Sequence, residues 1–146
     1  MPGVYIDTGL FVALTFNDDD NHERARELFE GAIQGTFGKP LHISIPVIVE
    51  TAAMVHRKSR GRTKRADACE RVHQILRVIE TYKIKIHFVN EQWKQLGIQI
   101  YLERNGQLDF VDSINVAFMR LNNCSNIISF DSDYDQFNNE GIVRIC

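Results

Sequence analysis

The segment VYIDT at residues 4–8 sets the pattern for the whole chain. Val4, Tyr5 and Ile6 are residue types that favour β-strands, and this short run ends directly at Asp7 and Thr8. An apolar stretch follows at residues 10–16, and the polar residues 17–21 then interrupt it. The segment therefore predicts a short strand with a carboxylate at its end.

Strand patterns recur along the sequence and alternate with helical ones. Four further short segments have the composition of strands, at residues 42–45, 84–88, 126–130 and 142–145. Between them, apolar residues repeat at intervals of three and four, which is the spacing of an amphipathic helix. This alternation predicts an α/β fold in which helices cover both faces of a parallel sheet. We expect residues 1–146 to form a single domain, because two domains of half this length would be hard to stabilise.

Several helix ends are marked in the sequence. Asp20 and Glu23 have the spacing of a capping pair before a helix that Gly35 closes. Pro46 suits the first turn of the next helix, which is expected to run to about Arg57.

Composition narrows the class of protein. The chain has 146 residues, 44% of them hydrophobic, and a formal net charge of −2, which excludes a disordered chain. Cys69, Cys124 and Cys146 are odd in number and lack CxxC spacing, which argues against a disulfide scaffold or a structural zinc site. Cys69 shares a helical stripe with Val72 and Ile79 and is expected in the core. We find neither the ~20 apolar residues of a membrane span nor a leader pattern, so we expect a cytoplasmic protein.

Acidic residues lie at or just after predicted strands in three places. Asp7 follows the first strand, Asp109 and Asp112 flank the start of a late helix, and Asp131 follows the fourth strand. In parallel α/β sheets, ligands bind outside the carboxyl ends of the strands. Helix capping is the alternative explanation for Asp7 and Asp109, because Asp is a preferred N-cap residue.

The segment from Asp131 to Asp135 places three acids at alternate positions, as a calcium-binding EF-hand loop does. Gln136 stands where that loop needs its glycine and Ile142 where it needs its bidentate glutamate, so we reject this interpretation. Asp131 is nearest the strand end and best placed to face the sheet edge. Asp133 is less favourably placed to do so, and Asp135 is expected to be solvated.

Glu50 interrupts the apolar segment IPVIVETAAMV at residues 45–55, which is expected to be helical. A carboxylate in such surroundings costs several kcal/mol of desolvation unless a cation meets it. An accidentally exposed helix stripe is the alternative.

Carboxylates gathered at one sheet edge need a cation. At a separation of about 4 Å, two of them repel by roughly 4 kcal/mol at an effective dielectric constant of about 20. Oxygen ligands select hard ions such as Mg²⁺ or Mn²⁺. Such ions can activate a water molecule and stabilise the leaving oxygen of a phosphodiester.

These segments resemble, in order and spacing, the signature of the PIN-domain family, most of all the VapC-type toxin ribonucleases of prokaryotes. The matching segments are VYIDT at 4–8, Glu50 in its apolar helix, DFVDS at 109–113 and ISFDSDY at 128–134. The resemblance implies a three-layer α/β/α sandwich with the strand order 3-2-1-4-5. It also implies an endoribonuclease that uses Mg²⁺ or Mn²⁺ and acts on RNA, a homodimer and, often, a cognate antitoxin protein.

The resemblance also implies roles for individual residues. The catalytic, metal-binding acids would be Asp7, Glu50, Asp112 and Asp131, with Asp133 as an auxiliary metal ligand. The polar residues supporting them would be Thr8, Asp109 and Ser129. Asp109 stands where the family often has Ser or another small polar residue. Tyr134 replaces a frequent Phe, a difference expected to change little.

A basic run follows the Glu50 helix: Arg57, Lys58, Arg60, Arg62, Lys64 and Arg65. We expect it to contact the RNA backbone, because phosphate binding is chiefly the work of Lys and Arg. A solvated helix end is the alternative interpretation.

Three other classes of protein offer alternative interpretations. A haloacid-dehalogenase-type phosphatase needs a second Asp two residues after Asp7, where this chain has Gly9. A response-regulator receiver needs paired acids near the first strand and a Lys after a late strand, and neither is evident. The remaining alternative is a PIN-like module that has lost catalysis and serves in RNA binding or assembly, against which the four acids argue.

Overall fold

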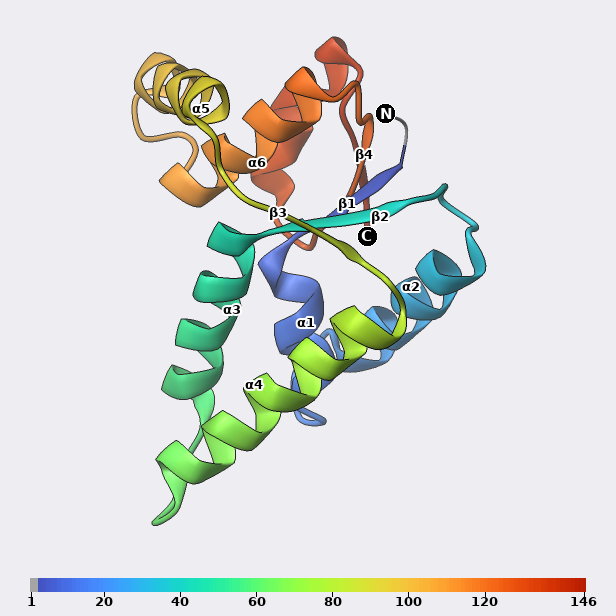
Figure 1. Cartoon of the computed structure of the whole chain (residues 1–146), viewed down its shortest axis with the longest axis vertical. Helices are drawn as coiled ribbons and strands as arrows, with labels where there is room; N and C mark the ends of the chain where they lie inside the picture. The colour runs from blue at the N-terminus through green and yellow to red at the C-terminus, as the bar shows by residue number, and fades with distance from the viewer. Residues whose placement is uncertain (1–2) are drawn as a thin grey trace.

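The computed structural model describes residues 3–146, which form a five-stranded parallel sheet between two layers of helices (Figure 1). The strands are β1 (Val4–Ile6), β2 (Leu41–Ser44), β3 (Lys85–His87), β4 (Asn126–Ile128) and β5 (Val143–Ile145). Their order is β3-β2-β1-β4-β5, and every neighbouring pair is parallel. The predicted fold class and strand order are confirmed.

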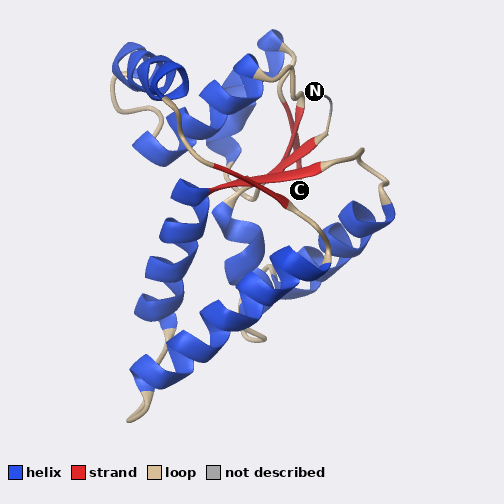
Figure 2. Ribbon diagram, in the orientation of Figure 1, coloured by secondary structure: helices blue, strands red, loops and turns tan. Residues whose placement is uncertain are grey.

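Helices cover both faces of the sheet (Figure 2). They are α1 (Thr8–Thr15), α2 (His22–Gln34), α3 (Ile45–Lys58), α4 (Lys64–Thr81), α5 (Glu91–Arg104), α6 (Phe110–Leu121) and the 3-10 helix η1 (Ser132–Glu140). Figure 1 shows α1 to α4 on one side of the sheet and α5 and α6 on the other. Within residues 3–146, we find no helix with the length and apolar content to cross a membrane.

Strand β1 lies at the centre of the sheet, and its position determines where the site can form. Val4, Tyr5 and Ile6 are all fully buried, because β2 and β4 flank the strand and helices cover both of its faces. All five strands run in the same direction, so their carboxyl ends meet at a common edge. The segments that follow β1 and β4 therefore emerge side by side.

The start of α2 differs from the sequence prediction. The helix begins at His22, with Asn21 rather than Asp20 in the N-cap position. The preceding turn is closed by Asp19, whose carboxylate accepts a 2.9 Å hydrogen bond from the Asn21 N–H. This local bond extends the polar turn past Asp20.

The buried face of α4 also differs, because Cys69 is exposed and does not belong to the core. The helix packs through Ala68, Ile75 and Ile79, with Val72 partly buried against the core. The apolar stripe is therefore shifted by one residue at the start of the helix, and Ala68 takes the place expected for Cys69.

Candidate active site

The first carboxylate of the site lies at the end of β1. Asp7 occupies the N-cap position of α1, but its side chain makes no capping hydrogen bond with the described residues of the helix. Its Oδ2 instead accepts a 2.7 Å hydrogen bond from the Ser129 hydroxyl, and its Oδ1 accepts one of 3.3 Å from the Asn115 amide. Helix capping therefore does not explain Asp7. Its carboxylate is held by Asn115 of α6 and by Ser129 in the segment after β4.

Helix α6 brings two acids to the same edge. Asp109 is its N-cap, and its carboxylate accepts a 2.8 Å hydrogen bond from the Asp112 N–H. Asp112 lies in the first turn and is 3% exposed, and its Oδ1 accepts a 2.7 Å hydrogen bond from the Tyr134 hydroxyl. The capping interpretation of Asp109 is therefore correct, and the cap places its carboxylate beside the buried Asp112.

The segment after β4 supplies further acids. The Asp131 N–H donates to Ser129 Oγ at 3.0 Å, and its Oδ1 accepts a 2.9 Å hydrogen bond from the Asp133 N–H. Asp112, Asp131 and Asp133 each offer a carboxylate oxygen, and these oxygens lie within 4.8 Å of one another. Asp135 is exposed and instead pairs with Arg144 at 2.8 Å. The structure thus brings the exposed Asp133, expected only as an auxiliary ligand, close enough to Asp112 and Asp131 for the three carboxylates to share an ion.

An open cavity of about 470 Å³ joins Asp7, Asp109, Asp112 and Asp131 to α3, whereas Asp133 is not among its lining residues. Its polar and charged lining residues are Asp7, Thr8, Glu50, Arg57, Asp109, Asp112 and Asp131. Glu50 is half-buried and lines this cavity together with the other acids, so it is not part of an exposed helix stripe. The four acids that the sequence places far apart therefore share one cavity beyond the ends of β1 and β4.

Burial and mutual repulsion raise the pKa of several of these acids. Burial is the main cause that raises the pKa of Asp7 to about 6, and the charges of Glu50 and Asp131 add to it. Burial likewise raises the pKa of Asp112 to about 8, and the Asp7 charge is the next largest contribution. The pKa of Glu50 is raised by burial and by the charges of Asp109 and Asp131. The Arg57 charge opposes that rise, as does the Thr8 hydroxyl, which lies near the Glu50 carboxylate but outside hydrogen-bond geometry. Such a group of buried carboxylates is stabilised in its ionised form by a cation.

The residues present fit a divalent cation. The donors are carboxylate oxygens, the ligands that hard ions prefer. Thr8, which is 3% exposed, lines the same cavity, and its hydroxyl makes no hydrogen bond with any residue of the range 3–146. A buried hydroxyl without a partner calls for a water molecule or a ligand. The cavity therefore offers both the charge and an unused oxygen to an incoming ion or its waters.

Sequence reasoning missed one residue of the site and misjudged another. Asn115 is fully buried, and its amide donates to Asp7 and to the Tyr134 hydroxyl. Tyr134 was expected to act much as Phe would, but its hydroxyl binds Asp112. The sequence did contain a signal for Asn115, because this amide lies three residues after Asp112 on the apolar face of a helix. An amide buried there needs polar partners.

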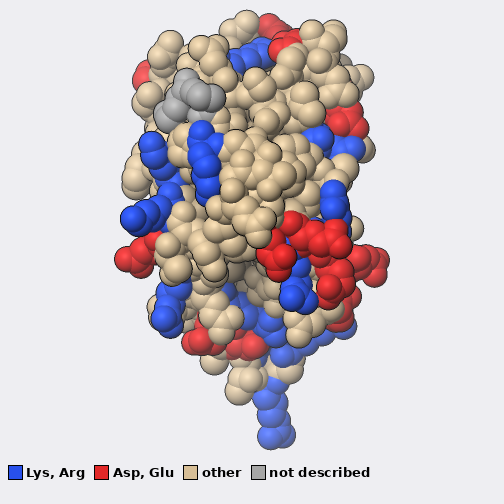
Figure 3. Space-filling view, turned by 90° about the vertical axis from the view of Figure 1, so that its right-hand side faces the viewer, with Lys and Arg blue, Asp and Glu red and all other residues tan. Residues whose placement is uncertain are grey.

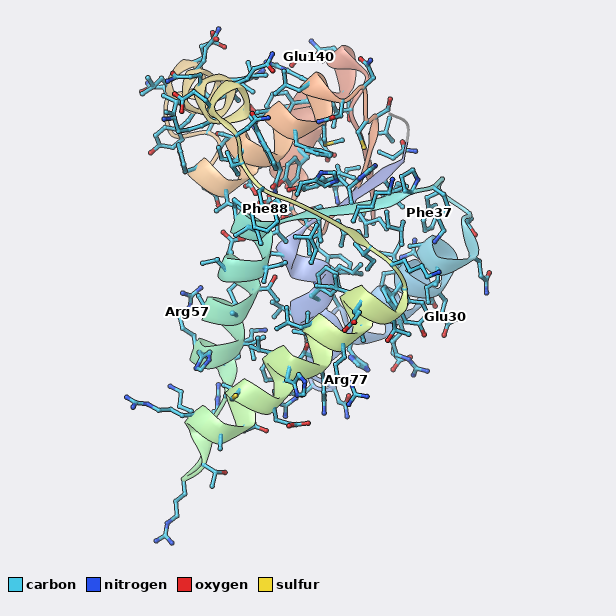
Figure 4. All side chains as sticks on the ribbon, viewed as in Figure 1. Glu30, Phe37, Arg57, Arg77, Phe88 and Glu140 are labelled. Carbon is cyan, nitrogen blue, oxygen red and sulfur yellow. The ribbon has the colours of Figure 1, made fainter. Side chains whose placement is uncertain are left out.

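The basic run does not form one surface beside the acids. Arg57 lines the cavity and projects from α3 (Figure 4), whereas Lys58 forms a 2.9 Å ion pair with Asp19. The other four cations are exposed at or near the turn between α3 and α4: Arg60, Arg62, Lys64 and Arg65. Helices α3 and α4 and the turn between them form a hairpin that projects from the body of the molecule (Figure 1). Figure 3 shows Lys and Arg side chains at the tip of this hairpin.

Fold and site together define an α/β protein with a carboxylate-lined cavity at the carboxyl edge of its parallel sheet. The model of the PIN domain family matches residues 4–140. The chain belongs to the PIN domain family, as the resemblance of its motifs indicated.

Solved structures share this fold. VapC20 of Mycobacterium tuberculosis, described as a sarcin-ricin loop cleaving toxin, is 22% identical with a TM-score of 0.72, and the match covers 98% of both chains. FitAcB from Neisseria gonorrhoeae is 13% identical with a TM-score of 0.69, covering 98% of this chain and 96% of that one. VapBC2 from Rickettsia felis, bound to a DNA fragment from its promoter, is 12% identical with a TM-score of 0.63, covering 99% of this chain and 98% of that one. No curated protein matches the chain in sequence.

Proposed function

We propose that this PIN-domain protein is an endoribonuclease that hydrolyses RNA phosphodiester bonds with Mg²⁺ or Mn²⁺. The observation that carries the proposal is the cavity in which Asp7, Glu50, Asp112 and Asp131 meet. Gathering these carboxylates is costly without a cation, so a purely structural role would not favour it. Membership of the PIN domain family and the fold shared with VapC20 support a nuclease.

The acids of the site would have different roles in binding the ion. Asp112, Asp131 and Asp133 would hold the ion, with Asp7 and Glu50 completing the negative cavity. When bound, Mg²⁺ or Mn²⁺ supplies an activated water and stabilises charge on the leaving oxygen of the phosphodiester.

Polar neighbours of the acids would orient the reacting groups. Ser129 holds the Asp7 carboxylate in place through its 2.7 Å hydrogen bond. The unpaired Thr8 hydroxyl would orient a ligand or a water molecule. Arg57, on the rim formed by α3, would contact a phosphate group of the RNA.

The projecting hairpin would extend the RNA path away from the cavity. Its exposed cations are Arg60, Arg62, Lys64 and Arg65, and Arg57 lies between this group and the acids. Phosphate contacts of this kind position RNA without reading its sequence. Lys58 would contribute less, because Asp19 already neutralises it.

We also propose that the protein is the toxin of a toxin-antitoxin pair, acts in the cytoplasm and forms a homodimer. The fold shared with VapC20, a toxin by description, and with VapBC2 supports an antitoxin partner. Exposed apolar side chains could serve either protein contact: Phe88 is 76% exposed, Leu102 is 68% exposed and Val49 is 62% exposed. Figure 4 shows Phe88 beside the start of α3.

Cleavage of an end-labelled RNA by the purified protein tests the proposed activity. We expect internal cleavage with millimolar Mn²⁺ or Mg²⁺ and no cleavage with EDTA. The rate of cleavage by Asp112→Asn should fall by about 100-fold or more. Asp135→Asn is the matched control, because Asp135 pairs with Arg144 outside the cavity, and it should cleave like the parent. RNA binding without cleavage in every metal would instead indicate the catalytically inactive RNA-binding or assembly module.

A further inference from the structure

A continuous network of buried polar side chains lies behind the acids. The Tyr5 hydroxyl is 2.7 Å from Ser44 Oγ and 2.7 Å from Asn115 Oδ1. The Asn115 amide nitrogen is 2.8 Å from the Tyr134 hydroxyl and 3.3 Å from Asp7 Oδ1. All four of these polar partners, Tyr5, Ser44, Asn115 and Tyr134, are fully buried.

The chemistry of the groups assigns every proton in this network. Asn115 Oδ1 can only accept, so Tyr5 donates its proton to Asn115, and the Ser44 hydroxyl must then donate to Tyr5. The two amide protons of Asn115 go to Asp7 and to the Tyr134 oxygen. Tyr134 therefore has its own proton free to donate to Asp112 at 2.7 Å.

All donors consequently point toward the acids. The network begins at Ser44 and ends at the carboxylates of Asp7 and Asp112, and each carboxylate receives a donor on its Oδ1. These bonds fix the rotation of both carboxyl groups from the side of the protein interior. Lone pairs not used by the network remain for the cavity, since a carboxylate offers about four acceptor sites.

The network also connects the elements that carry the site. Ser44 is the N-cap of α3, and its Oγ accepts a 3.3 Å hydrogen bond from the Val47 N–H. Helix α3 carries Glu50, whereas Asn115 belongs to α6 and Tyr134 to η1. A single set of buried hydrogen bonds thus ties together the three helices on which the site depends, with Tyr5 of β1 at the centre.

We propose that Asn115 and Tyr134 are positioning residues that hold Asp7 and Asp112 in the orientation a divalent cation requires. This inference rests on the proposed metal-dependent function. A buried amide and a buried phenol cost desolvation free energy unless each polar atom has a hydrogen-bond partner. Apolar side chains could fill the same space without that cost. The hydrogen bonds of Asn115 and Tyr134 instead converge on two acids of the cavity. Side chains that orient metal ligands in this way typically change metal affinity or activity by about 10- to 100-fold when removed.

Tyr134→Phe tests the proposal, because it deletes the hydroxyl and keeps the ring. The matched control is Tyr82→Phe, since Tyr82 is partly exposed and packs on Phe29 away from the site. Mn²⁺ dissociation constants are measured by electron paramagnetic resonance, and single-turnover RNA cleavage gives the rate and the RNA concentration for half-maximal rate. We expect Tyr134→Phe to bind Mn²⁺ roughly 10-fold more weakly and to cleave more slowly at saturating RNA, with its RNA affinity unchanged.

The outcomes separate this inference from the proposed function. A parent protein that binds no Mn²⁺ would contradict the proposed function itself. A parent that binds Mn²⁺ while Tyr134→Phe binds it equally well and cleaves at the same rate would overturn the positioning role alone.

A double variant keeps the test decisive if the single one does not fold. Tyr134→Phe with Asn115→Leu removes the hydroxyl together with the amide that donates to it, so no amide donor is left without a partner, and Tyr5 can donate to Ser44 instead. Its melting temperature without metal establishes that it folds. We expect it to bind Mn²⁺ at least 10-fold more weakly than the parent. Parental Mn²⁺ affinity in the folded double variant would contradict the proposal.

Discussion

Asp109 and Asp112 are joined by a 2.8 Å hydrogen bond in which the Asp109 carboxylate accepts from the Asp112 backbone N–H. The bond caps α6 and also holds a second negative charge beside Asp112, which is 3% exposed. Capping and a role in the site are therefore compatible at this helix end. The cap that begins the helix also contributes to the repulsion that a cation would relieve.

The metal-free protein should lose stability as the pH rises. The pKa of Asp7, about 6, and that of Asp112, about 8, lie above the ordinary value of 3.8, so the folded protein holds protons that the unfolded chain releases. Their contribution to stability is full below about pH 4 and is lost as the pH rises through these two values. Urea unfolding in EDTA between about pH 5 and about pH 9 measures it. Asp112→Asn should flatten the decline above pH 7, and an identical decline in this variant would contradict the assignment.

Millimolar Mn²⁺ should raise the melting temperature. An ion at 100 times its dissociation constant stabilises the folded state by about 2.7 kcal/mol, which corresponds to roughly 5–10 °C for a chain of this size. The shift should grow from about pH 6 to about pH 8, because the carboxylates must lose their protons to bind the ion. Differential scanning fluorimetry should show a smaller shift in Asp112→Asn and a parental one in Asp135→Asn. Equal shifts in the two variants would show that the ion binds outside this cavity.

Glu50→Gln should separate function from stability. The substitution removes one charge from the cavity and keeps the shape of the side chain, so the metal-free protein should be at least as stable as the parent. Cleavage with Mn²⁺ should fall by roughly 100-fold or more. If Glu50 served mainly as an ion-pair partner of Arg57, breaking the pair would cost up to about 3–5 kcal/mol and spare cleavage. Urea unfolding and single-turnover cleavage on the same preparation distinguish the two roles.

The hairpin between α3 and α4 should bind RNA through phosphate contacts. Replacing Arg60, Arg62 and Lys64 by Gln should weaken binding to unrelated RNAs alike and reduce the salt slope by up to about 2, since single strands lose about 0.7 per phosphate contact. The Mn²⁺-induced melting shift should not change.

A charge-matched control tests this assignment. Arg26, Lys39 and Lys83 are exposed cations outside the hairpin, and their replacement by Gln changes the net charge equally. Fluorescence anisotropy at several salt concentrations compares the two triple variants. Equal slopes in both would assign the basic run to solubility.

The sequence was sufficient for the fold because strand and helix patterns alternate without interruption. Parallel strands place their carboxyl ends together, so acids after β1 and β4 had to converge. Glu50 stood out because its sequence neighbours are apolar, and burying a carboxylate among apolar side chains is costly. The structure places Glu50 in the wall of the acidic cavity, where a cation can offset that cost.

The sequence could not show which oxygens are oriented by which donors. Asn115 looks like one polar residue in an apolar helix, and its role depends on Tyr5 and Tyr134, which are distant in the chain. The close approach of Asp133 to Asp112 depends on the local turn that begins η1. Such contacts arise from packing between elements and have no periodic signal in the sequence.

The central claim is that the acids of this cavity bind a divalent cation, and anomalous diffraction from crystals grown with Mn²⁺ tests it most directly. We predict an anomalous peak within about 2.5 Å of carboxylate oxygens from both Asp112 and Asp131, and its loss in Asp112→Asn crystals. A map without a peak among these acids, at a Mn²⁺ concentration that supports RNA cleavage, would contradict the account.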